Sequence, residues 1–127
     1  MRVFVGLLSF LMIGAEARTL KPGEWGGQHV RLVVQADAAA LEFDCARGTI
    51  PGKIALRANG AFEMRGRYRR EHGGPVRKGE ESAGVPVTYR GRLTDATLTL
   101  EVIAEDGTTL GAFELSRGAP GRLVKCR

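Results

Sequence analysis

Apolar and polar residues alternate along most of the chain after residue 29. Val30, Leu32 and Val34 fall on one side of an extended run, while Arg31 and Gln35 fall on the other. Successive side chains of a strand face opposite sides of a sheet, so this alternation indicates strands with one buried face. The pattern predicts eight strands and no helix of consequence after residue 17, with strands over residues 30–35, 41–46, 49–58, 62–69, 85–93, 98–104, 109–117 and 122–126.

Short turn signals separate these predicted strands. Asn59-Gly60 and Asp106-Gly107 tolerate positive φ and predict tight hairpins, the first of type I′. Arg47-Gly48 predicts a turn after the second strand. Pro51-Gly52 predicts an edge, a bulge or a late start in the third strand. Turns this short favour pairing between strands that are consecutive in sequence.

Sequential antiparallel strands with one apolar face bury that face by curling into a barrel or by stacking as a sandwich. A barrel removes the exposed edges. We therefore predict an all-β fold, an antiparallel eight-strand meander closed into a small barrel, as a single domain over residues 18–127. The one long interruption, residues 71–85, is rich in glycine and poor in apolar side chains, which predicts a surface loop.

The first seventeen residues differ from the rest. Arg2 precedes an apolar run over residues 3–13, and Ala15-Glu16-Ala17 fits the pattern that signal peptidase cleaves. The run is shorter than the roughly 20 residues that a membrane-spanning helix needs. We predict that residues 1–17 are a cleaved secretory signal, that the protein is periplasmic or secreted, and that the mature chain has no transmembrane segment. The alternatives are a retained membrane anchor and a buried helix.

Cys45 and Cys126 are the only cysteines. Two cysteines in an oxidising compartment are expected to pair, and two free thiols are the alternative. The disulfide would close a loop of about 80 residues and would stabilise the fold by roughly 4 kcal/mol. In the predicted meander it would join the second strand to the eighth, across the first.

The chain is basic, with a formal net charge of +5 at pH 7. An exported basic protein meets anionic surfaces or acidic partner proteins rather than nucleic acid. Alternation places three arginines of residues 62–69 on one polar face, and further basic residues follow. The candidate face for an anionic partner comprises Arg65, Arg67, Arg69, Arg70, Arg77, Lys78, Arg90 and Arg92. The alternative is a solvated face that is partly neutralised by Glu63, Glu71, Glu80 and Glu81.

Two resemblances add to this picture. Gly23-Glu24-Trp25, followed by an eight-strand meander, resembles the opening of lipocalin- and avidin-like barrels, in which a tryptophan near the first strand closes one barrel end. This resemblance implies a topology only, because the chain lacks the set of tryptophans of the avidins. The runs WGGQHVRL, LEFDCARGTI, EHGGPVR and TLGAFELSRG resemble an uncharacterised family of small secreted bacterial proteins over nearly the whole mature chain. That family has no assigned activity, so it implies no catalytic residues.

Catalytic or metal chemistry has little support in the sequence. His29, Glu71 and His72 would converge as zinc ligands only if the long loop folded over the first strand. Ser82 and Ser116 lack the context of a catalytic nucleophile. The carboxylate pairs that share a strand face, as a glycosidase would require, are better interpreted as solvated: Glu42 with Asp44, and Glu101 with Glu105. We predict no enzymatic activity, no cofactor and no metal.

The leading functional hypothesis is an exported protein-interaction module of the bacterial envelope, with contacts carried by residues 71–85 and the basic face. Small disulfide-bonded barrels include periplasmic inhibitors of lysozymes and metalloproteases, an analogy of architecture alone. The alternative is a barrel that binds a small apolar or amphipathic ligand in a cavity lined by Trp25, Phe43, Leu56, Met64, Tyr89, Leu100 and Phe113. A filled interior would count against that alternative. A metal protein or enzyme that uses His72 is a third hypothesis.

Overall fold

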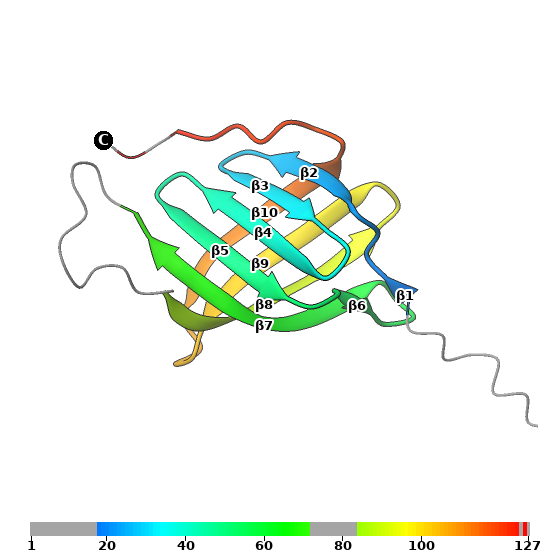
Figure 1. The fold of residues 1–127 in the computed structure, drawn as a ribbon, viewed down its shortest axis with the longest axis horizontal. Coiled ribbons are helices and arrows are strands. Elements are labelled where there is room, and N and C mark those ends of the chain that lie inside the picture. The colour runs from blue at the N-terminus through cyan, green and yellow to red at the C-terminus, as the bar shows by residue number, and fades with distance from the viewer. Residues whose placement is uncertain (1–17, 72–83, 125, 127) are drawn as a thin grey trace, which may run out of the picture.

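The computed structural model describes residues 18–71, 84–124 and 126, and its main feature is a closed barrel of antiparallel strands (Figure 1). Consecutive strands pair around the barrel, and the last strand returns to the first. These are β2 (Gly23–Gly27), β3 (Val30–Val34), β4 (Ala38–Phe43), β5 (Ala46–Pro51), β7 (Ala61–Arg70), β8 (Val85–Thr94), β9 (Thr97–Ala104) and β10 (Thr109–Arg117). The predicted all-β, antiparallel eight-strand closed barrel is confirmed.

The barrel has the predicted number of strands, but one of the eight differs from the predicted set. The predicted first strand, residues 30–35, is β3, and it is preceded by a further strand, β2, in a hairpin that turns at Gln28 and His29. Conversely, the described residues of the predicted last strand, 122–124 and 126, form no strand, and Arg122 makes an isolated parallel bridge to Gln28. β2 was missed because Trp25 is its only large apolar residue, so it has no alternation to detect.

Two turn predictions were also wrong. Arg47 and Gly48 lie inside β5, and the preceding turn is at Asp44 and Cys45. Gly48 is required there by packing rather than by a turn, because a Cβ at this position would collide with the Tyr89 hydroxyl. At Asn59-Gly60 the chain does turn, but only Gly60 has a positive φ (83°), so the turn is not of type I′.

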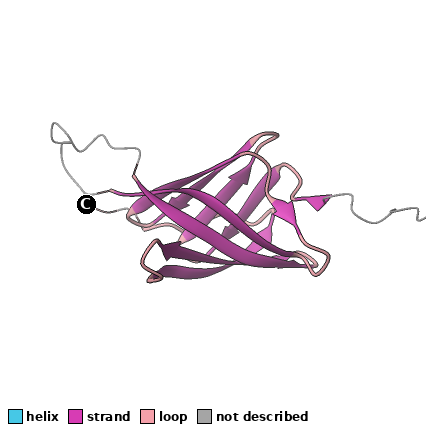
Figure 2. Ribbon diagram, turned by 90° about the horizontal axis from the view of Figure 1, so that it is seen from below, coloured by secondary structure: helices cyan, strands magenta, loops and turns pink. Residues whose placement is uncertain are grey.

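The segment after β5 leaves the barrel, and Pro51 ends β5 rather than marking an edge, a bulge or a late start within it. Within it β6 (Ala55–Leu56) pairs with β1 (Arg18–Thr19) in a separate two-stranded sheet. β7 therefore pairs with β5 and β8, and not with the end of the predicted third strand. The small sheet lies at the end of the barrel opposite the chain's C-terminus (Figures 1 and 2).

One apolar cluster fills the barrel. The inward positions predicted from alternation are buried along β3, β4 and β9, and the largest fully buried side chains are Tyr89 and Phe62. Leu20, Ile54 and Leu56 extend the core at the end that carries β1 and β6. No polar or charged side chain of the described residues is buried, so the interior is a packed apolar core.

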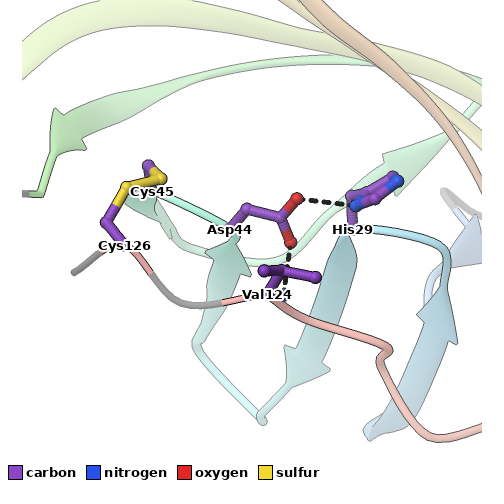
Figure 3. Close-up of a disulfide and its surroundings, with 5 residues drawn as sticks. All are labelled: His29, Asp44, Cys45, Val124 and Cys126. Atoms are coloured by element: carbon purple, nitrogen blue, oxygen red, sulfur yellow. Dashed lines mark hydrogen bonds and ion pairs between the residues drawn. A yellow bond between two sulfur atoms is a disulfide. The ribbon is translucent and has the colours of Figure 1, made fainter.

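The C-terminal tail runs beside β2 and ends in the disulfide. The Gly118 N–H donates to the Glu24 carbonyl (2.8 Å), the Arg122 N–H to the Gly27 carbonyl (3.0 Å), and the His29 N–H to the Arg122 carbonyl (2.8 Å). The predicted Cys45–Cys126 disulfide is confirmed, with its Cα atoms 5.2 Å apart (Figure 3). It joins the tail to the β4–β5 turn, however, and not one strand to another.

Several predictions fall on residues outside the described ranges. These are the secretory signal over residues 1–17 and most of the loop predicted over residues 71–85, including His72, Arg77 and Lys78. Val85, at the end of that predicted loop, is the first residue of β8. In the part of the chain that is described, no helix is long and apolar enough to cross a membrane.

Candidate functional site

The basic residues of β7 lie on the outside of the barrel. Arg65, Arg67 and Arg69 are exposed, while Phe62 and Gly66 on the opposite face are buried. The strand register adds a residue that the sequence analysis missed: Arg47 of β5 lies directly opposite Arg69. Arg47 was assigned to a turn, although the inward positions Ala46, Gly48 and Ile50 on either side of it would have placed it outward.

An outward row of charged residues crosses four strands. Arg31 of β3 lies opposite Glu42 of β4, Glu42 lies opposite Arg47, and Arg47 lies opposite Arg69. The neighbouring row carries small side chains, with Ala40 opposite Thr49. Long side chains beside short ones leave a depression in the barrel surface.

This depression, which we call the arginine groove, has a volume of about 330 Å³. It is lined by Ala40, Leu41, Glu42, Arg47, Gly48, Thr49, Arg67 and Arg69. Three of these residues are arginines and one is a glutamate. The groove therefore combines an excess of positive charge with a floor of small side chains.

The arginines of the groove differ in their hydrogen-bond and ion-pair partners. Arg47 Nε contacts Glu71 Oε1 at 3.1 Å, and Arg67 Nη2 donates to the Gly84 carbonyl at 2.7 Å. The Arg69 guanidinium has no hydrogen bond or ion pair with any residue of the described ranges. Like charges on directly opposed residues of neighbouring strands, as at Arg47 and Arg69, are destabilising.

The rest of the predicted basic face does not belong to the groove. Arg65 pairs with Glu105 (3.3 Å) and Arg90 with Glu101 (3.7 Å), both at the exposed surface. Arg90 and Arg92 lie opposite Glu63 and Ala61, towards the start of β7 and away from Arg69. The pairing of β7 with β8 places Arg90 diagonal to Arg65 on the outer face, while Arg92 lies further from the β7 arginines.

Arg70 also differs from its assignment. It follows the inward parity of Phe62 and Tyr68 and lies opposite Ala46, which is buried. It lines a second pocket of about 200 Å³ at the end of the barrel that holds the β4–β5 turn. This pocket, which we call the mouth pocket, is lined by His29, Phe43, Asp44, Cys45, Tyr68, Arg70 and Phe113.

Most of the residues predicted to line an internal ligand cavity are instead part of the packed core. Trp25, Leu56, Tyr89 and Leu100 are all buried. Met64 and Phe113 are partly buried against the same cluster, and of the seven only Phe43 and Phe113 line the mouth pocket.

Two buried aromatic residues carry specific polar contacts. The Arg117 guanidinium lies 5.1 Å from the centroid of the Trp25 ring, which is a cation–π geometry. The Tyr89 hydroxyl donates to the Arg67 carbonyl at 2.5 Å. Burial raises the pKa of Tyr89 above its ordinary range, so its phenol stays neutral and keeps this hydrogen bond beneath the arginine groove.

Among the residues that the structure describes, no three His, Cys, Asp or Glu side chains cluster closely enough to hold a metal ion. His29 Nδ1 lies 2.6 Å from Asp44 Oδ2, and Glu71 contacts Arg47. The predicted approach of His29 to Glu71 and His72 depends on His72, which lies outside the described residues.

Comparison with known proteins adds no family to these observations. No family model, no curated protein and no solved structure matches this chain. Both resemblances inferred from the sequence stay predictions, and a function has to be argued from the two pockets themselves.

Proposed function

We propose that this protein is an exported, non-enzymatic docking barrel whose arginine groove binds an acidic segment of a partner protein in the bacterial envelope. The observation that carries the proposal is the groove itself, in which Arg47, Arg67 and Arg69 surround small side chains. Arg47 and Arg69 are kept side by side at a cost to stability, and a bound carboxylate would offset their repulsion.

The chemistry of the groove favours a protein partner. Guanidinium groups match carboxylates with two parallel hydrogen bonds. β4, β5, β7 and β8 carry seven arginines and no lysine, and protein interfaces are enriched in arginine and depleted of lysine. Glu42, which pairs with Arg31, adds one negative charge at the edge of the groove.

The proposed location rests on two observations. The first seventeen residues have the composition of a secretory signal. The Cys45–Cys126 disulfide is typical of proteins that fold in an oxidising compartment. The acidic partner would then be another envelope or secreted protein.

The test is calorimetric titration of the oxidised protein with a synthetic polyglutamate peptide at an ionic strength of about 0.15 M, where the Debye length is about 8 Å. Arg69→Glu is expected to weaken binding at least about tenfold, because each lost charge-assisted hydrogen bond corresponds to about 1.5–3 kcal/mol and 1.4 kcal/mol is tenfold in Kd. Arg92→Glu changes the net charge equally at an outward position outside the groove. It is expected to leave binding within about twofold, since screened charges at a distance contribute little.

Two further probes separate other anions from proteins. Inorganic polyphosphate and vesicles of anionic phospholipid are titrated under the same conditions. Groove-dependent binding that is tighter for polyphosphate or vesicles would replace the protein partner with a phosphate-bearing one. Equal losses for Arg69→Glu and Arg92→Glu, or no binding of the peptide, would overturn the proposal.

A further inference from the structure

We propose that the mouth pocket is a second, independent binding site, which takes a small monocyclic aromatic carboxylate. The pocket lies at one end of the barrel, whereas the arginine groove lies on its outer wall. The two share no lining residue, and the groove's arginines take no part in the argument below.

Aromatic rings from three strands form the apolar part of the pocket. Phe43 of β4 lies between Tyr68 of β7 and Phe113 of β10, with ring centroids 5.5 Å and 5.1 Å apart. Both pairs are tilted, by 54° and 41°. Phe43 is buried, but Tyr68 and Phe113 are only partly buried. Aromatic rings attract one another in such offset or tilted arrangements, so a planar ring in the pocket would extend the cluster.

Gly111 leaves room for the Phe113 ring. A Cβ at Gly111 would lie 2.6 Å from a carbon of that ring. The β9–β10 register also shifts between Thr109 and Gly111, which marks a bulge at this end of β10. Bulges re-aim side chains. The glycine and the bulge together allow the Phe113 ring to lie in the wall of the pocket.

Arg70 supplies the positive charge. Its strand parity points it towards the pocket, and its cross-strand partner Ala46 is too short to cover it. No described residue forms an ion pair or a side-chain hydrogen bond with the Arg70 guanidinium. A guanidinium at the edge of an aromatic pocket suits a ligand with an apolar ring and a terminal carboxylate.

Asp44 lines the same pocket as Arg70, but its two carboxylate oxygens contact other groups. Asp44 Oδ2 lies 2.6 Å from His29 Nδ1, and Asp44 Oδ1 accepts from the Val124 N–H at 2.8 Å (Figure 3). The tail that carries Val124 is tied to the neighbouring residue by the Cys45–Cys126 disulfide. His29 is held in a positive-φ conformation (67°) that few non-glycine residues adopt. This network keeps the acid turned to His29 and to the tail.

The volume of the pocket limits the ligand. Sites for drug-sized ligands usually occupy about 300–1,000 Å³, and the mouth pocket has about 200 Å³. Below it lies the packed core, in which Tyr89 and Leu100 are fully buried. A long acyl chain would find no channel to enter, so the structure favours a single ring over a fatty acid.

The experiment titrates benzoate into the oxidised protein up to millimolar concentrations, followed by NMR of the aromatic side chains. Benzoate is expected to shift the Tyr68 and Phe113 resonances. Arg70→Gln is expected to weaken its binding about tenfold, and benzamide, which lacks the charge, should bind the unaltered protein about tenfold more weakly than benzoate. Octanoate, which carries the carboxylate without a ring, should bind more weakly than benzoate.

Arg69→Gln is the matched control, because it is the next residue on the same strand but points outward into the groove. It should leave benzoate binding unchanged, while Arg70→Gln should leave polyglutamate binding unchanged. Failure of this site is thus distinguishable from failure of the groove. Absence of benzoate-induced shifts, equal binding of benzamide, or equal losses for the two variants would overturn the inference, as would tighter binding of octanoate than of benzoate. Circular dichroism of each variant checks that the barrel is intact.

Discussion

The arginines on two outer faces of the same barrel have different neighbours. On the face formed by β2, β3 and β4, Arg31 lies between two carboxylates, with Nη1 3.0 Å from Glu42 Oε1 and Nη2 in contact with Glu24. On the face formed by β5 and β7, Arg47 lies opposite a second arginine, Arg69. One arginine has two acidic partners, whereas the other face holds three arginines around a hollow.

The difference lies in the partners of Arg31 and Arg69. A hydrogen bond and ion pair with Glu24, followed by the contact with Glu42, raise the pKa of Arg31. Arg69, on a strand of the same barrel, lacks any such partner among the described residues. Exposed ion pairs stabilise proteins little. The difference between Arg31 and Arg69 therefore matters more for which guanidinium can bind a ligand than for the stability of the fold.

The largest expected effect comes from the disulfide, which ties the tail to the barrel beside the Arg31 face. Replacing Cys45 and Cys126 with alanine should lower the free energy of unfolding by about 4 kcal/mol, measured in urea, because a long loop is no longer closed in the unfolded chain. Hydrogen exchange should show the amides of His29 and Arg122 exposed first. Equal loss of protection along β7 and β8 would show that the tail does not act locally.

The second prediction concerns the support beneath the groove. Tyr89 has a pKa raised by burial, so its neutral form favours the folded state. That contribution is complete below the unfolded pKa of about 10 and is lost as pH rises above it. Tyr89→Phe should cost about 1 kcal/mol at neutral pH through the lost hydrogen bond to the Arg67 carbonyl.

Urea unfolding of both proteins between neutral and alkaline pH measures this effect. The difference in the free energy of unfolding between Tyr89→Phe and the unaltered protein should shrink above about pH 10. Above that pH Tyr89 ionises in the unfolded state of the unaltered protein and must be protonated again on folding, whereas phenylalanine cannot ionise. A difference that stays constant across that range would contradict the account of Tyr89.

The smallest predicted effect is that charge reversal changes the free energy of unfolding in opposite directions on the two faces. Arg69→Glu creates an opposite-charge pair with Arg47 and should stabilise the fold by roughly 0.2–1 kcal/mol. Arg31→Glu loses its pairs with Glu24 and Glu42 and should destabilise it by up to about 1 kcal/mol. Both changes in the free energy of unfolding should diminish in high salt. Destabilisation by Arg69→Glu would mean that Arg69 has a structural role.

The parts of the fold that were predicted correctly depend on local patterns. Alternation with a period of two placed Phe62 and Tyr89 inside and Arg65, Arg67 and Arg69 outside, and two cysteines allowed only one pairing. Alternation failed where glycines interrupt it, as at Gly26 and Gly27 of β2. It also predicted a last strand where residues 122–124 belong to the tail beside β2.

The candidate sites were harder to predict, because they depend on contacts between residues far apart in the sequence. Gly48 resembled a turn residue, yet its lack of a side chain accommodates Tyr89 from another strand. Arg47 was missed for that reason. Phe43 and Phe113 meet across the barrel, and no pattern within one strand could show it. Arg70 is different, since extending the alternation of β7 by two residues would have placed it inward.

The central claim is that the arginine groove, and not the Arg31 face, is the docking surface. Its most direct test is backbone NMR of the oxidised protein during titration with the polyglutamate peptide. The account predicts shifts concentrated at Arg47, Thr49, Arg67 and Arg69, with the amides of Glu24 and Arg31 unmoved. Shifts spread evenly over all exposed arginines, or centred on β2 and β3, would contradict it.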